Sequence, residues 1–102
     1  MSKKPPINQR YYEPIPGETH KAFMAFCLYR DMGGGRSLDA AYRLHSGRES
    51  GRHSRHWAEW SRRFHWVKRA QAYDRHIMRQ RRKATEEARA RRFAEYMAEL
   101  GL

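Results

Sequence analysis

The sequence predicts an all-α protein in which three short helices, with a helix-turn-helix variant among them, precede one long C-terminal helix. Apolar residues recur at helical spacing through the first three quarters of the chain, and a Ser or Thr precedes each short helical segment. Residues 67–99 contain neither Gly nor Pro and are rich in strong helix formers. A length of 102 residues leaves room for a single core.

Residues 1–17 are predicted to form an extended, basic arm. They hold all four prolines of the chain together with Lys3, Lys4 and Arg10. Proline lacks a backbone donor and disfavours helix interiors. Two interpretations are open: disorder, which is the commoner fate of a terminus and the one we favour, or contact of the arm with phosphates or a DNA groove.

The first two helices are bounded by clear signals. The first is expected over 20–32, from an N-cap at Thr19 to a stop at Gly33. Its apolar residues cover more than one side, which predicts burial on more than one side. The second, after an N-cap at Ser37, is expected over 38–45. The residues of the second helix expected to pack inward are Leu38, Ala41, Tyr42 and Leu44.

The third helix is predicted to be amphipathic and to carry the candidate recognition surface. It is expected over 55–64 after an N-cap at Ser54, with a core-facing aromatic stripe of Trp57, Trp60 and Phe64. At about 100° per residue, the opposite face holds Arg55, Ala58, Glu59 and Arg62, flanked by His56 and Arg63. Planar arginine guanidinium groups can bind guanine or phosphate, and a small residue beside them lets the helix approach closely. This surface is typical of a helix that binds in the major groove.

The fourth helix is predicted to be long and to change character along its length. Its first half has an inward stripe of Trp66, Ala70, Tyr73 and Ile77. Between 79 and 92 the only apolar residues are alanines, and larger ones return at Phe93, Tyr96, Met97 and Leu100. We therefore divide the chain into a helix-turn-helix domain, 18–78, and a stalk, 79–102, for homo-oligomerisation or partner binding. The alternative for the stalk is a fraying helix that folds back.

Positive charge is concentrated in one region of the chain. Residues 43–83 contain thirteen Lys or Arg against three acids, so they carry +10 of the total net charge of +11. This balance favours a polyanionic partner, double-stranded DNA first, over an ordinary solvated surface, although structured RNA stays open. The predicted DNA-binding residues are Arg36, Arg52, Arg55, His56, Arg62, Arg63, Lys68 and Arg69.

The sequence gives no support for catalysis, so we expect no enzyme activity, cofactor or metal. His53 and His56 lie one helical turn apart, but two ligands do not make a metal site. The lone Cys27 sits in an apolar helix without an activating base and excludes an internal disulfide. The longest apolar run, 22–29, is too short to cross a bilayer, which predicts a soluble intracellular protein without a membrane partner.

Several motifs resemble the N-terminal helix-turn-helix region of phage and prophage small terminase subunits. The likeness extends from about residue 13 to residue 79. It is carried by Glu13-Pro-Ile-Pro-Gly-Glu18, Tyr29-Arg-Asp-Met-Gly33, Arg36-Ser-Leu38, Trp60-Ser61, Trp66-Val-Lys-Arg-Ala70 and Ala72-Tyr-Asp74. The chain departs from the family in its loop 46–52, which is several residues longer than the usual tight turn, and in ending at Leu102, before a fuller oligomerisation region.

The resemblance implies a DNA-recognition protein of genome packaging. Such a protein oligomerises, often as a ring, binds the packaging site of the viral genome and presents it to the large terminase subunit in the cytoplasm of the infected bacterial host. Two other functions fit the same residues. One is a phage or prophage transcriptional regulator that binds a palindrome as a dimer. The other is a protein-binding adaptor or inhibitor with a basic surface, whose binding would survive salt.

Overall fold

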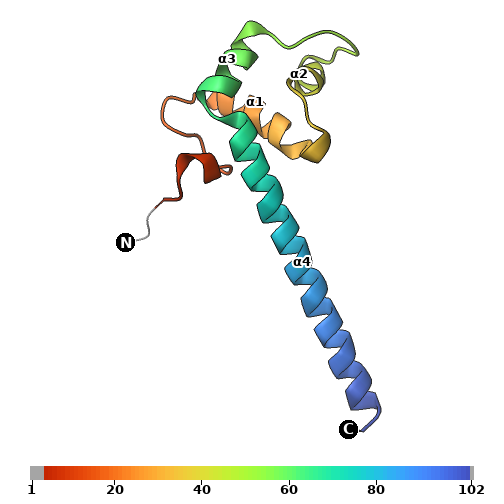
Figure 1. The fold of residues 1–102 in the computed structure, drawn as a ribbon. Helices are drawn as coiled ribbons and strands as arrows, with labels where there is room; N and C mark the ends of the chain where they lie inside the picture. The colour runs from red at the N-terminus through yellow and green to blue at the C-terminus, as the bar shows by residue number, and fades with distance from the viewer. Residues whose placement is uncertain (1–3, 102) are drawn as a thin grey trace.

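A computed structural model describes residues 4–101 and confirms the all-α class. Within this range a 3-10 turn, Ile7–Gln9, precedes α1 (His20–Asp31), α2 (Leu38–Ser46), α3 (Arg55–Arg63) and α4 (Trp66–Glu99), and no strand occurs. Helices α1, α2 and α3 gather at one end of the molecule, around the start of α4. The rest of α4 projects away from them (Figure 1). Lys3 of the predicted arm and Leu102 of the predicted stalk lie outside the described residues.

The helices begin at the predicted caps because short hydroxyl side chains satisfy the first free N–H groups. Thr19 accepts from the Ala22 N–H at 3.1 Å, Ser37 from Ala40 at 3.0 Å and Ser54 from Trp57 at 3.4 Å. A left-handed Gly33 follows α1, and a left-handed Gly47 ends α2. The predicted bounds of all four α-helices are confirmed to within about one residue, which is the usual spread of helix-end assignment. The fourth, α4, begins after left-handed His65 without a side-chain cap.

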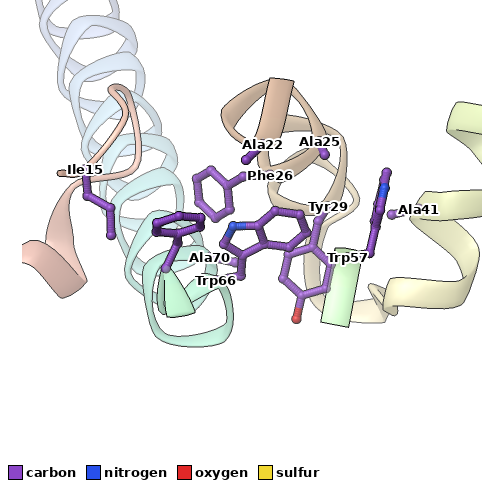
Figure 2. Packing of buried hydrophobic residues seen from close by; sticks show 10 residues of the cluster. Ile15, Ala22, Ala25, Phe26, Tyr29, Ala41, Trp57, Trp66 and Ala70 are labelled. Atoms are coloured by element: carbon purple, nitrogen blue, oxygen red, sulfur yellow. The ribbon is translucent and has the colours of Figure 1, made fainter. Parts of the chain in front are cut away.

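The core is built around the indole of Trp66, at the start of α4, which is fully buried. Its ring lies 5.9 Å from those of Phe26 and Tyr29 and 5.8 Å from that of Trp57 (Figure 2). Buried alanines on α1, α2 and α4 allow the helices to approach closely around these rings. The aromatic core predicted from the sequence is therefore present, with Trp66 at its centre; Trp60, which was predicted to face the core, is only partly buried.

A buried ion pair joins the segment before α1 to α4. The carboxylate of Glu18 and the guanidinium of Arg69 lie 3.0 Å apart, and both side chains are fully buried. The same carboxylate accepts from the Trp66 indole N–H at 3.2 Å. The remaining donors of Arg69 reach backbone carbonyls of Arg10, Phe64 and Glu13 at 2.6–3.1 Å. This network satisfies both charges and fastens three segments together.

The predicted disorder of the arm is wrong for its described part, residues 4–17. Ile15 is buried in the core, and the Tyr11 and Tyr12 rings lie 5.5 and 5.8 Å from that of Tyr73 on α4. The arm is held because Arg69 needs carbonyl acceptors, which the arm supplies, and because its aromatic rings cover α4. Figure 1 shows this segment beside the first turns of α4.

A second ion pair closes the other side of the helical unit. Arg36 donates to both carboxylate oxygens of Asp74 on α4, one of them at 2.7 Å. Its other donors reach the carbonyls of Tyr29 and Arg30 at 3.1 and 2.9 Å. These carbonyls belong to the last turn of α1, so Arg36 caps that helix and ties it to α4.

The molecule divides into a packed head, residues 4–78, and the described part of the stalk, 79–101. The principal extents of 65 × 43 × 18 Å reflect the projecting stalk. Of the stalk residues, only Ala88 and Met97 are partly covered, and all others are exposed. One inward prediction for the head needs correction: Leu44 of α2 is 65% exposed, because α2 turns only its Ala41 side fully into the core. On α1, Met24 is 51% exposed.

Candidate nucleic-acid interface

The α3 helix separates an apolar face from a basic one. Trp57 and Phe64 point into the core and are 3% and 4% exposed. On the solvent side, Arg55, Ala58, Glu59 and Arg62 are all exposed and line a shallow groove. This division arises from helical periodicity alone, because residues three and four apart return to one face. The result is a short helix pinned by aromatic rings that presents two guanidinium groups to solvent.

The loop before α3 is long but tied down. His53 donates its backbone N–H to Asp39 at 2.8 Å, and its Nδ1 lies 2.6 Å from the same carboxylate oxygen. A carboxylate only accepts, so Nδ1 carries the proton in this contact. Arg43 of α2 also donates to the Gly51 carbonyl at 3.0 Å. The loop therefore meets α2 at two points directly before Ser54, the N-cap of α3.

The contact with His53 changes the titration of Asp39. Hydrogen bonds from the His53 backbone and ring hold the pKa of the Asp39 carboxyl below its usual value. The sequence interpretation weighed His53 only as one of two insufficient metal ligands and missed this role. The signal was not visible in the sequence, because Asp39 and His53 are 14 residues apart across a loop.

Six of the eight predicted DNA-binding residues are exposed on one part of the chain. They come from the end of the loop, from α3 and from the first turn of α4: Arg52, Arg55, His56, Arg62, Arg63 and Lys68. Arg63 lies against the Phe64 ring at 5.4 Å, which orients its guanidinium. These residues form the candidate interface.

Arg69 and Arg36 do not belong to this interface, which corrects the prediction for both. Arg69 is fully buried and has all its contacts within the head. The Arg36 side chain is 8% exposed and pairs with Asp74. Neither guanidinium is free to reach a phosphate, since moving it would leave a buried carboxylate or helix-end carbonyls without a partner.

Lys68 is the only predicted DNA-binding residue in a basic stripe along α4. Lys68, Arg75, Arg79 and Arg82 are exposed and lie within a narrow sector of the helix at about 100° per residue. Their spacing of seven, four and three residues indicates a shared helix face, but the sequence analysis used these residues only in the net charge of 43–83. Arg81 and Arg92 carry the same charge on the other side of α4.

The geometry offers little to a metal or nucleophile. In the part of the chain that the structure describes, no group of three or more His, Cys, Asp or Glu lies close enough to hold a metal ion. Burial raises the pKa of the Cys27 thiol, which is the opposite of what an activated thiolate requires.

Comparisons with known proteins add no relative. No protein-family model, curated protein or solved structure matches the chain. The resemblance to small terminase subunits therefore depends on the motifs quoted above. Among residues 4–101, no helix is long and apolar enough to cross a membrane.

Proposed function

We propose that the protein binds double-stranded DNA with α3 as its recognition helix. The observation that carries the proposal is the division of α3 into a buried aromatic face and a solvent face bearing Arg55 and Arg62. A rigidly held helix of this size fits the major groove, and Arg presents a planar fork that matches guanine or a phosphate. The Asp39–His53 contact supports the proposal because it fixes the chain just before the helix begins.

The remaining basic residues are proposed to contact the DNA backbone. Arg52 precedes α3, while Arg63 and Lys68 follow its exposed face toward α4. Contacts to phosphates fix the register of the protein without reading sequence. The stripe of Arg75, Arg79 and Arg82 extends this backbone surface beyond the head. Each phosphate contact adds to the salt dependence of binding.

Within DNA binding, we propose a packaging function, in which the protein recognises viral DNA and presents it to the large terminase subunit. Support comes from the motif resemblance to small terminase subunits and from the exposed apolar end of α4, which suits assembly of several copies. A transcriptional regulator with the same recognition helix is the second candidate. It differs by binding a palindrome as a dimer.

The test is a salt titration of binding to duplex DNA by the wild-type protein, Arg55→Gln/Arg62→Gln and the matched control Arg81→Gln/Arg92→Gln. Both variants remove two positive charges from exposed positions, so net charge cannot explain a difference between them. The α3 variant should bind at least about tenfold more weakly and lose up to about two units of the log–log salt slope, with the control close to wild type.

Two outcomes would contradict the proposal. Absence of duplex binding by the wild type at low salt would exclude both DNA functions and leave the basic adaptor or an RNA ligand. Equal losses in the two variants, with both folded by circular dichroism, would show that only net charge matters. Preference for a terminase-gene segment over a promoter-like palindrome separates packaging from regulation.

A further inference from the structure

The end of α4 carries an apolar surface that its own chain leaves uncovered. Phe93, Tyr96 and Leu100 are 64%, 56% and 51% exposed, and Met97 lies between them. Spacings of three, four and seven residues place these four side chains, here called the tip, on one face of the helix. The same spacing marks helices that dock into a groove on a partner.

A complementary groove lies on α1, at the opposite end of the molecule. It has a volume of about 600 Å³, and its floor is formed by Met24, Ala25, Cys27 and Leu28. Lys21 stands at one end and Asp31 at the other, so the exposed face of α1 reads Lys21, Met24, Leu28, Asp31 along its axis. We call this surface the α1 groove. It is an apolar surface onto which a tip could pack.

The tip cannot enter the α1 groove of its own chain. The α4 helix is continuous from Trp66 to Glu99, without a Gly or Pro to bend it. Figure 1 shows its C-terminal end pointing away from α1. A helix of 34 residues spans about 50 Å. Any tip seated in the groove therefore comes from another molecule.

Charge and length indicate how the two surfaces meet. Arg89 lies one turn before Phe93 on the same side of α4, whereas residues 93–101 contain Glu95 and Glu99 and no Lys or Arg. An antiparallel arrangement sets Arg89 near Asp31. It sets the C-terminal end of α4, whose last carbonyls carry partial negative charge, near Lys21, while Glu95 and Glu99 face away from the tip at about 100° per residue. The stretch from Arg89 to Leu100 is about 16 Å long and that from Lys21 to Asp31 about 15 Å, so the two stretches match in length. Asp31 is available, because it stays 55% exposed beside Arg30.

We propose that the tip of one molecule docks antiparallel in the α1 groove of a second copy. Two tips packed in parallel would bring the basic residues Arg89, Arg91 and Arg92 of both copies close, and tip-to-tip packing in either direction leaves the groove open. A tip-to-groove contact is heterologous, so it propagates head to tail until it closes as a ring or continues as a filament. This inference specifies the assembly suggested under the proposed function, but it does not depend on DNA binding.

Mixing two complementary variants tests the contact without DNA. Phe93→Glu damages the tip, Met24→Glu damages the groove, and Met78→Glu places the same charge at an exposed apolar site of α4 outside both surfaces. Mass in solution is measured for each at about 100 µM, a concentration at which a contact with a micromolar Kd is populated. The wild type and Met78→Glu should assemble, whereas each of the other two should fall to the monomer mass of 12.3 kDa.

An equimolar mixture of Phe93→Glu and Met24→Glu should recover a species of twice the monomer mass. One intact tip then meets one intact groove, and the pair cannot extend. A monomeric wild type would overturn this inference and the proposed assembly together. Failure of the mixture to recover, or assembly of Met24→Glu like wild type, would overturn the tip-to-groove contact alone. Circular dichroism confirms that each variant is folded.

Discussion

The head and the stalk share the α4 helix, but different interactions stabilise it in the two regions. In the head, α4 is packed by Phe26, Tyr29 and the arm, and no buried side-chain N or O atom of the described residues lacks a hydrogen-bond partner. In the stalk, nearly every side chain meets solvent, and helix propensity replaces packing. The head is therefore maintained by its own contacts, whereas the stalk leaves almost all its side chains open to solvent.

The largest effect expected from this contrast is at the centre of the head. Trp66→Ala removes a fully buried ring that lies against four others, so it should cost about 3–5 kcal/mol of unfolding free energy. Trp60→Ala should cost less, because Trp60 is partly exposed. Urea unfolding followed by circular dichroism measures both. A larger loss for Trp60 than for Trp66 would contradict the observed core.

The buried ion pair comes next. Glu18→Ala leaves the fully buried Arg69 guanidinium without its carboxylate and should cost about 3 kcal/mol or more. Glu18→Ala/Arg69→Met should recover part of this loss, since it removes the uncompensated charge together with its partner. The arm should loosen in Glu18→Ala/Arg69→Met, because this variant lacks the guanidinium that holds the arm carbonyls. Proteolysis within residues 4–17 would report that loosening, and an arm as resistant as in the wild type would exclude the role given to Arg69.

In the stalk the same kind of substitution should do little to folding. Phe93→Ala should change the unfolding free energy of a monomeric sample by less than about 0.5 kcal/mol, because the side chain is 64% exposed and has no core to leave. Urea unfolding at low protein concentration gives the value. A loss of about 2 kcal/mol would mean that the stalk folds back on the head.

The smallest effect concerns the contact that orients α3. The pKa of Asp39 is lowered in the folded protein by His53, so the contact stabilises the fold at pH values above the ordinary carboxyl pKa. That contribution is lost as the pH falls through the lowered folded-state value. Asp39→Asn should abolish this part of the acid dependence and weaken DNA binding more than it weakens folding. Unchanged binding by a folded Asp39→Asn would remove the positioning role.

Local features of the fold were predictable from the sequence, and long-range partners were not. Thr19, Ser37 and Ser54 cap helices through atoms three residues away, so spacing alone identifies them. Arg69 and Glu18 are 51 residues apart, and Arg36 and Asp74 are 38 apart. Arg69 and Arg36 were therefore predicted to contact DNA, because the carboxylates that bind them lie far away in the sequence.

The same limit explains the arm and the candidate site. The prolines correctly predicted that residues 4–17 form no α-helix, but the acceptors they offer Arg69 exist only in the folded head. The solvent face of α3 was predictable because it follows from 100° periodicity and needs no distant partner. The long loop before α3 was interpreted only as a departure from the small terminase family. Its attachment to Asp39 could be seen only in the structure.

Hydrogen exchange with and without a short duplex tests the central proposal most directly, namely that α3 and the adjoining basic surface bind DNA whereas the tip binds protein. The account predicts slowed exchange in the loop before α3, in α3 itself and in the first turns of α4. Exchange at 93–101 should stay unchanged at a concentration where the protein is monomeric. Protection confined to 79–101, with α3 exchanging as in the free protein, would contradict it.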